Sequence, residues 1–333
     1  MNKNWIESLP KMDLHCHLDG SIHPQRIRDY FAAAGKALPD DFDRWISVEE
    51  DCPSLTEYLR CFDLPLRWLQ TSEGLSQAVV DLLHDARAEN TRYLEIRFAP
   101  TLHLEEGLSY DQVFQALERG REQGERETGV RCRFIVCAMR HHSMTDNLAM
   151  LEAASGHWPQ LVCAADLAGD ENAFPNRLFA PFFSRAQELG LSYTIHAGET
   201  GSRENIYAAL ELGACRIGHG IAMAGDPELM KLCRKQEIGI EICPTSNFQT
   251  KAASGWASYP MRDYLAAGLR VSLNTDNRTV SRTDQNREYL RAMEEGGASR
   301  EEILQLLKNG CLMSFAPQEL KDAYLRELEQ FGV

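Results

Sequence analysis

The sequence lacks an excess of basic residues. Its 35 Lys and Arg are outnumbered by 49 Asp and Glu, which gives a formal net charge of −14 at pH 7. A surface of that sign repels a phosphate backbone at long range, and no local basic patch is visible to offset the repulsion. Nucleic acid is therefore not an expected partner, whereas a free nucleoside is not excluded.

Paired cysteine motifs and long apolar runs are absent as well. The ten cysteines form no Cys-x-x-Cys pair and are scattered, many of them inside apolar runs where a reduced thiol behaves as a small hydrophobic group. No stretch of about 18 uncharged apolar residues could span a membrane, and the first residues lack the apolar run of a signal peptide. These absences predict a reduced, cytoplasmic protein without a membrane segment, and they leave its oligomeric state open.

Short apolar runs with strand character alternate with helical patterns along the chain. This order is expected of a parallel sheet built from βα units, and eight such units predict an α/β fold closed as a (β/α)8 TIM barrel. Helical patterns from about 284 to 328 predict extra C-terminal helices. No repeat, low-complexity tract or linker divides the chain, so residues 1–333 are predicted to form a single domain. The predicted strands are 12–16, 93–98, 133–138, 161–167, 192–196, 215–218, 238–242 and 269–274.

About 75 residues separate the first two predicted strands, and their helical patterns predict a helical insertion over 24–90. Within it, apolar residues recur at helical spacing over 55–62. The periodicity alone fits either a lid over the barrel mouth or an ordinary amphipathic helix packed on the outside.

His15 and His17 end the first predicted strand, two positions apart, so both side chains point to the same side. Imidazole nitrogens are the commonest ligands of zinc-like cations, which favours a metal site. The pair also fits two hydrogen-bonded histidines of an interior. Cys16 lies between them, points to the opposite face and is predicted to be a core residue.

Further polar groups follow the ends of other predicted strands, where barrels of this kind gather their reacting groups. His196 and Glu199 follow the fifth strand, His219 the sixth and Asp276 the eighth. Three histidines and one carboxylate are a full set of protein ligands for a divalent cation, with zinc the leading candidate, and they leave one position for water. An open position is typical of a catalytic metal.

Two of these groups suggest acid–base chemistry on a substrate. Glu199 lies three residues after His196 and is placed to donate or accept a proton, although a carboxylate stabilising the start of a following helix has the same pattern. His219 lies between two glycines, which leave its ring accessible, so it is predicted to orient or deprotonate a water molecule.

Six motifs occur in order along nearly the whole chain: His-Cys-His-Leu-Asp-Gly at 15–20, Leu-Ala-Gly-Asp-Glu at 167–171, His-Ala-Gly-Glu at 196–199, Arg-Ile-Gly-His-Gly at 216–220, Ile-Cys-Pro at 242–244 and Ser-Leu-Asn-Thr-Asp at 272–276. In residue type and order they resemble the adenosine deaminase family of the amidohydrolase-type barrels.

The resemblance implies one zinc ion per chain, held by His15, His17, His196 and Asp276. It implies that hydroxide attacks C6 of an adenine ring while Glu199 donates a proton to N1, and that ammonia leaves to give inosine or deoxyinosine.

The other implied catalytic roles belong to His219, which would hold the hydroxide, and to Asp276, which would accept a hydrogen bond from it.

The resemblance also implies the substrate contacts. Asp19 is similar to the residue that binds the ribose 5′-hydroxyl, which favours adenosine and deoxyadenosine, although an Asp before Gly20 also fits the cap of a turn. The backbone of Gly169 would address the N3 edge of the purine. An apolar gate over the nucleoside strengthens the lid interpretation of 55–62. The implied substrate-binding residues are His17, Asp19, Gly169, Asn277, Leu55, Tyr58, Leu59 and Phe62.

One position departs from the family pattern. Asn277 stands where vertebrate-type members have a second Asp that contacts purine N7, and an amide donates to this acceptor without first binding a proton. Arg278 next to it is predicted to meet an anionic 5′-substituent or to form a surface ion pair. His141 and His142 have no partner spacing and are predicted to be polar loop residues.

Other functions were weighed against adenosine deamination. A 5′-modified adenosine, such as aminodeoxyfutalosine or methylthioadenosine, is the main alternative substrate, with adenine and AMP behind it. A protein that only binds nucleoside or metal would be expected to lose Glu199 or His219, and both are present. A binuclear hydrolase would need a bridging Lys or carboxylate near the fourth strand, and 161–167 contains no Lys.

Overall fold

Eight parallel strands form the centre of the molecule in a computed structural model that describes residues 2–53 and 55–332, without the side chains of residues 55 and 56. They pair in order as two four-stranded sheets, β1 to β4 and β5 to β8. The strands are β1 Lys11–His17, β2 Thr91–Phe98, β3 Arg131–Met139, β4 Val162–Ala168, β5 Thr194–Ala197, β6 Arg216–His219, β7 Gly239–Ile242 and β8 Arg270–Leu273. All eight predicted strands are confirmed, with ends shifted by at most two residues.

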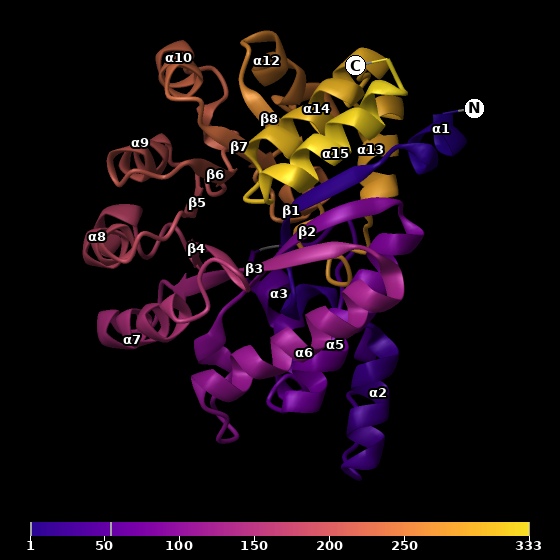
Figure 1. Ribbon diagram of the computed structural model, residues 1–333, viewed down its shortest axis with the longest axis vertical. Helices are drawn as coiled ribbons and strands as arrows, with labels where there is room; N and C mark the ends of the chain where they lie inside the picture. Colours follow the sequence, from indigo (N-terminus) through magenta and orange to yellow (C-terminus); the bar gives the residue numbers. More distant parts are fainter. Residues whose placement is uncertain (1, 54, 333) are drawn as a thin grey trace.

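The two sheets meet at both of their edges. A parallel bridge joins Ala165 of β4 to Tyr193, just before β5, and another joins Cys16 of β1 to Asp276, after β8. The strands therefore follow one another around a ring, with helices between successive strands on the outside (Figure 1). This is the predicted α/β arrangement of a (β/α)8 barrel.

The helices follow the strands along the chain. They are α1 Asn2–Ser8, α2 Pro24–Ala33, α3 Leu55–Leu59, α4 Asp63–Trp68, α5 Ser72–Ala88, α6 Tyr110–Thr128, α7 Met144–Ser155, α8 Ala180–Glu188, α9 Arg203–Glu211, α10 Pro227–Lys235, α11 Pro244–Gln249, α12 Met261–Ala266, α13 Gln285–Glu294, α14 Arg300–Met313 and α15 Gln318–Glu329. The last three confirm the predicted C-terminal helices, and α14 packs on β1 and β8 across one edge. No helix in the described ranges is both long and apolar enough to cross a bilayer.

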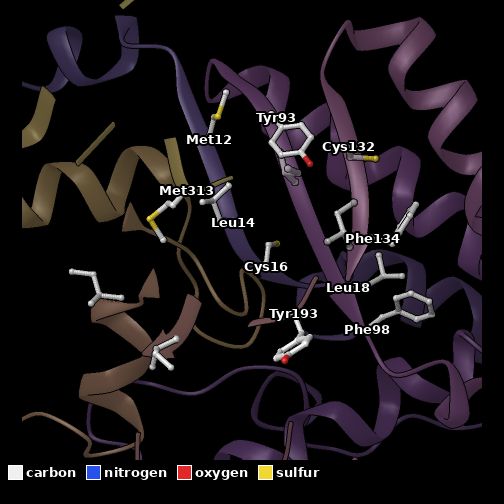
Figure 2. Packing of buried hydrophobic residues seen from close by; sticks show 14 of the residues in the cluster. Met12, Leu14, Cys16, Leu18, Tyr93, Phe98, Cys132, Phe134, Tyr193 and Met313 are labelled. Carbon is white, nitrogen blue, oxygen red and sulfur yellow. The ribbon is translucent and has the colours of Figure 1, made fainter. Parts of the chain in front are cut away.

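The two faces of strand β1 have different surroundings. Met12, Leu14 and Cys16 alternate along it and belong to the large buried apolar cluster between strands and helices (Figure 2). His15 and His17 occupy the alternate positions and point to the opposite side, into the ring of strands. Cys16 is thus a core residue, as predicted.

The segment predicted as a helical insertion has two parts. Its last helix, α5, packs on α6 and β2 on the outside of the strands, in the position of an ordinary barrel helix. The short helix α3 instead lies near the loop after β8, where Tyr58, Cys61 and Val280 form a small buried cluster. The part around α3 and α4 therefore does not pack as an ordinary barrel helix does.

Candidate active site

Four histidine rings meet at the carboxyl ends of three strands. His15 and His17 come from β1, His196 from β5 and His219 from β6. The centroid of the His15 ring lies 5.5 Å from that of His17, 4.7 Å from that of His196 and 4.8 Å from that of His219. Asp276, after β8, reaches the same point: its Oδ1 lies 3.5 Å from Nε2 of His15 and 3.4 Å from Nε2 of His17.

The cluster fits a divalent metal ion. Two overlapping groups, His15 with His17 and His196, and His15 with His219 and Asp276, each have ligand atoms within 4.8 Å of one another. Nε2 of His15 is buried and makes no hydrogen bond in the described part of the chain. A buried imidazole nitrogen without a partner costs free energy unless a cation accepts its lone pair. The donor set therefore explains this nitrogen as a metal ligand.

Two buried carboxylates orient the histidines from behind. Nδ1 of His15 donates to Glu241 over 2.9 Å, and Nδ1 of His196 faces Asp166 Oδ2 at 2.9 Å. A carboxylate on Nδ1 fixes the tautomer and turns Nε2 toward the metal position. Arg97 links the two carboxylates, because it donates to Asp166 over 2.6 Å and to Glu241 over 2.7 Å.

These carboxylates keep their charges although they are fully buried. Burial alone would raise the pKa of Glu241, but the guanidinium groups of Arg216 and Arg97 outweigh it and hold that pKa well below its usual range. Burial would likewise raise the pKa of Asp166, but the neighbouring His196 and Arg97 outweigh it and lower that pKa. The site thus rests on fixed negative charges next to the imidazoles.

The sequence analysis gave no role to Glu241 or Arg97. Glu241 is a charged residue inside the otherwise apolar strand Gly239–Ile242, and Arg97 lies between Ile96 and Phe98 in β2; those apolar neighbours were the available signal. A buried charge needs a partner of opposite sign, so such residues must pair across the barrel. Their partners lie far away in sequence and only the closed ring brings them together.

Glu199 and His219 lie side by side near the metal ligands. Nε2 of His219 is 3.6 Å from Glu199 Oε2. Asn247 donates to Nδ1 of His219 over 3.0 Å, and Tyr259 in turn donates to Asn247 Oδ1 over 2.8 Å. Burial, followed by the nearby charge of His15, holds the pKa of His219 well below its usual range. The neutral ring therefore carries its proton on Nε2, the nitrogen that faces Glu199.

Glu199 does not cap the helix that follows it. The following helix α9 is capped by Ser202, whose side chain accepts from the amide of Asn205, so the capping interpretation of Glu199 does not hold. Burial, followed by the charges of Asp276 and Glu171, raises the pKa of Glu199 to about 8. Its carboxyl group is accordingly protonated at neutral pH.

Glu171 is a third residue for which the sequence gave no role. Its carboxylate accepts from the amides of Gly198, Glu199 and Thr200 at 2.6, 3.0 and 3.2 Å. These three bonds fix the loop on which Glu199 stands. Its position in the sequence, four residues before Pro175 and 25 residues before His196, offered no indication of this contact.

A cavity of about 360 Å³ opens in front of the cluster. This volume lies in the range of small-molecule sites. Asp19 extends into it with a buried Oδ1 that makes no hydrogen bond within the described residues. The predicted site residues that line the cavity are His17, Asp19, Tyr58, Leu59, Phe62, Gly169, His196, Glu199, His219, Asp276 and Asn277. Leu55 opens α3, and its side chain lies outside the described part of the structure.

Two expectations from the sequence need correction. Arg278 meets neither a substrate nor a surface partner, because its side chain is buried in an ion pair with Asp13 at 3.1 Å and with Glu89 at 2.5 Å. The burial of this position was not visible from the sequence around it. His141, predicted to be only a polar loop residue, lines the cavity beside Asp170, whereas His142 does not.

The fold and the cluster together define an α/β-barrel amidohydrolase. An amidohydrolase from Burkholderia ambifaria, solved with bound zinc, shares the fold with a TM-score of 0.89 at 22% identity over 98% of this chain and 93% of that one. An adenine deaminase from Arthrobacter aurescens has a TM-score of 0.89 at 25% identity over 97% and 99%.

Within that class, the chain belongs to the adenosine deaminase family. Residues 10–331 match the family model for adenosine deaminase. An adenosine deaminase from Enterococcus faecalis is 37% identical over 333 residues, 99% of each chain. The resemblance deduced from the six motifs is confirmed.

Replacing Asp166 by Asn tests the carboxylates behind the histidines. His196 would lose a charged partner at Nδ1 and Arg97 one of its two carboxylates, so affinity for a divalent metal ion should fall about 10- to 100-fold. Competition with a metallochromic chelator measures the affinity. Asp146→Asn, on the exposed start of α7, is the matched control and should leave it unchanged. Equal affinity in Asp166→Asn and the control would contradict the orienting role.

Proposed function

We propose that this protein hydrolyses adenosine and 2′-deoxyadenosine to inosine and deoxyinosine, releasing ammonia. The observation that supports the proposal most is the convergence of a protonated Glu199, a neutral His219 and a metal-ligand cluster on one wall of a cavity of nucleoside size. Membership of the adenosine deaminase family supports the same reaction.

His15, His17, His196 and Asp276 would hold one zinc ion per chain, in line with their three imidazole nitrogens and one carboxylate oxygen. When bound, zinc lowers the pKa of a coordinated water from 15.7 to about 7, so that hydroxide is available at neutral pH. Burial would raise the pKa of Asp276, but the imidazole of His15, whose Nε2 lies 3.5 Å away, holds it well below its usual range. Asp276 is thus an anion that accepts hydrogen bonds and binds cations.

Glu199 is the proposed general acid. Its raised pKa keeps a proton on the carboxyl group at neutral pH, and that proton is transferred to N1 of the adenine. Protonated N1 withdraws electron density from C6 as the oxygen nucleophile adds there, so the acid acts on the same transition state as the attack.

His219 is the proposed holder of the attacking oxygen. Because Asn247 donates to its Nδ1, the proton on Nε2 is free to be donated to an oxygen in front of the ring. A neutral donor at this place stabilises the negative charge that develops on that oxygen. In this arrangement His219 is better suited to hold the nucleophile than to deprotonate it.

The remaining cavity residues are proposed to bind the nucleoside. Asp19 would accept a hydrogen bond from the ribose 5′-hydroxyl, consistent with its unpartnered Oδ1. The amide of Gly169 would address purine N3, and Asn277 would donate to N7. Tyr58, Leu59 and Phe62 of the lid would cover the base and exclude water.

The charges of the cavity favour an uncharged 5′-substituent. Among the described residues that line it, four are aspartates and one is a glutamate, and none is Lys or Arg. A 5′-phosphate would face Asp19 without a cation to bind it, and phosphate recognition relies on such cations. We therefore place AMP behind adenosine as a substrate.

Two further assignments belong to this proposal. We infer that residues 1–333 act as one domain, with the part of 24–90 around α3 and α4 as the lid over the cavity. We also infer a cytoplasmic location, in keeping with ten cysteines that are all free thiols, nine of them buried.

The function is tested by comparing substrates. Zinc-loaded protein should release ammonia from adenosine and deoxyadenosine with a higher kcat/KM than from methylthioadenosine, aminodeoxyfutalosine, adenine or AMP. A glutamate-dehydrogenase-coupled assay measures the ammonia. A preference for any of the last four compounds, or no ammonia from any of them, would overturn the proposal.

Replacing Glu199 by Gln tests the general acid. The amide keeps the size of the carboxyl group but has no acidic proton, so kcat should fall by at least about 100-fold while the metal is retained. Stopped-flow absorbance gives kcat, and mass spectrometry of the protein gives the metal content. Glu204→Gln, exposed in the first turn of α9, is the matched control and should retain normal kcat. Near-normal turnover by Glu199→Gln would exclude Glu199 from the reaction.

The pH profile follows from the same carboxyl group. A group with a pKa of about 8 in the substrate-free protein is protonated below that pH, so kcat/KM should be level near neutrality, fall to half near pH 8 and then decrease tenfold per pH unit. Glu199→Gln should remove this alkaline decrease from its residual rate. A profile that stays level through pH 10 would show that Glu199 is not the proton donor.

A further inference from the structure

A chain of hydrogen bonds connects the lid helix α3 to the loop after β8. Asn277 Nδ2 donates to the hydroxyl of Tyr58 over 2.9 Å, and that hydroxyl lies 2.8 Å from Ser281 Oγ. All three residues are at most 3% exposed. Tyr58 and Asn277 also line the cavity. The chain therefore joins a lid residue to a residue of the proposed purine site.

The Asn277 amide is confined on both sides. A Cβ atom at Gly20 would lie 1.9 Å from Asn277 Oδ1, so only glycine leaves space for the amide in this position. Oδ1 is buried and makes no hydrogen bond within the described residues. Nδ2 has two protons, of which one is donated to Tyr58 and the other has no partner among the described groups. The amide thus has a proton left for a ligand in the cavity.

The Tyr58 hydroxyl determines which way the amide points. Either of the hydroxyls of Tyr58 and Ser281 can donate to the other; when the phenol gives its one proton to Ser281 Oγ, its oxygen is left to accept from Asn277. Ser281 is itself fixed by its backbone, since its amide donates to the carbonyl of Asn277 over 2.8 Å and its carbonyl accepts from Gln249 over 3.2 Å. A hydroxyl held in this way requires Nδ2, not Oδ1, to face it.

Resting on the proposed function, we propose that Tyr58 and Ser281 are positioning residues that hold the Asn277 amide with Nδ2 toward purine N7. Purine N7 is only an acceptor, so a donor there stabilises the bound base, whereas an amide turned by 180° would present Oδ1 and repel it. Without the Tyr58 hydroxyl, nothing among the described contacts of the amide favours the donating orientation.

This assignment makes the enzyme selective for rings that have an acceptor at position 7. It also links selectivity to lid position, because Tyr58 lies on α3 and reaches Asn277 only while α3 covers the cavity. A carboxylate in place of Asn277 would need a proton before it could donate, and the hydrogen-bond chain removes that need.

The test compares adenosine with 7-deazaadenosine, in which N7 is replaced by C–H. The measured quantity is the ratio of their kcat/KM values in zinc-loaded wild type, Tyr58→Phe, Asn277→Ala and the double variant. Intrinsic reactivity differs between the two rings, but it is common to all four proteins and cancels when their ratios are compared. Tyr58→Phe should lower the ratio about tenfold, the usual worth of one hydrogen bond to a neutral group. Asn277→Ala should lower the ratio by the same factor, and the double variant should have the same ratio as either single variant.

Two controls separate positioning from general damage. Tyr324→Phe removes another buried hydroxyl, which donates to the carbonyl of Pro10 at the opposite end of β1, and should leave the ratio unchanged. Ser281→Ala tests the chain without altering any cavity wall residue and should lower the ratio in the same direction as Tyr58→Phe.

The outcomes distinguish this inference from the proposed function. If wild type deaminates adenosine and both Tyr58→Phe and Ser281→Ala keep its ratio, the positioning role is wrong and the proposed function stands. A wild type that deaminates neither compound would overturn both. The ratio could also fall in Tyr58→Phe and fall again in the double variant by the full effect of Asn277→Ala. The two residues would then act independently, which also contradicts the inference.

Discussion

The buried ion pairs of Arg97 with Asp166 and Glu241 are the interaction on which the site depends. Each carboxylate also faces Nδ1 of a metal-site histidine, so one guanidinium group links the two histidines that come from opposite sheets. Buried charges are costly unless they are fully paired, and removing one partner leaves the other unpaired. The orientation of the imidazoles is therefore fixed by the same contacts that hold the inside of the barrel together.

A consequence of this arrangement is that neighbouring groups hold different charge states at one pH. The carboxylates behind the histidines remain charged because guanidinium and imidazole groups surround them. Burial and the charges of other carboxylates instead raise the pKa of Glu199, which therefore keeps its proton. Pairs of titratable groups whose environments separate their pKa values define acid and base roles. The carboxyl group of Glu199 is thus neutral at a pH at which the carboxylates behind the histidines are anions.

Much of the fold followed from the sequence, and for a definite reason. Strands of a parallel barrel are buried on both faces and appear in the sequence as short apolar runs, so the eight strands could be predicted. Reacting groups lie in the loops after the strand ends, so the candidate residues around His15 and Asp276 could be predicted as well. The partners of the buried charges could not be predicted from the sequence, because Arg97 and Glu241 are 144 residues apart and pair only in the closed ring. The same holds for Arg278, whose partners Asp13 and Glu89 lie on distant segments. The link between Tyr58 and Asn277 spans 219 residues and was likewise invisible.

The central claim is that side chains from three strands and one loop hold a single cation on which the reaction depends. The most direct measurement is to strip the protein with a chelator, add back zinc in known amounts, and follow bound metal by mass spectrometry together with the rate of inosine formation from adenosine. The account predicts a rate that is negligible without metal and rises in proportion to occupancy up to one zinc ion per chain. Full activity of the stripped protein, or a rate that keeps rising to two ions per chain, would contradict it.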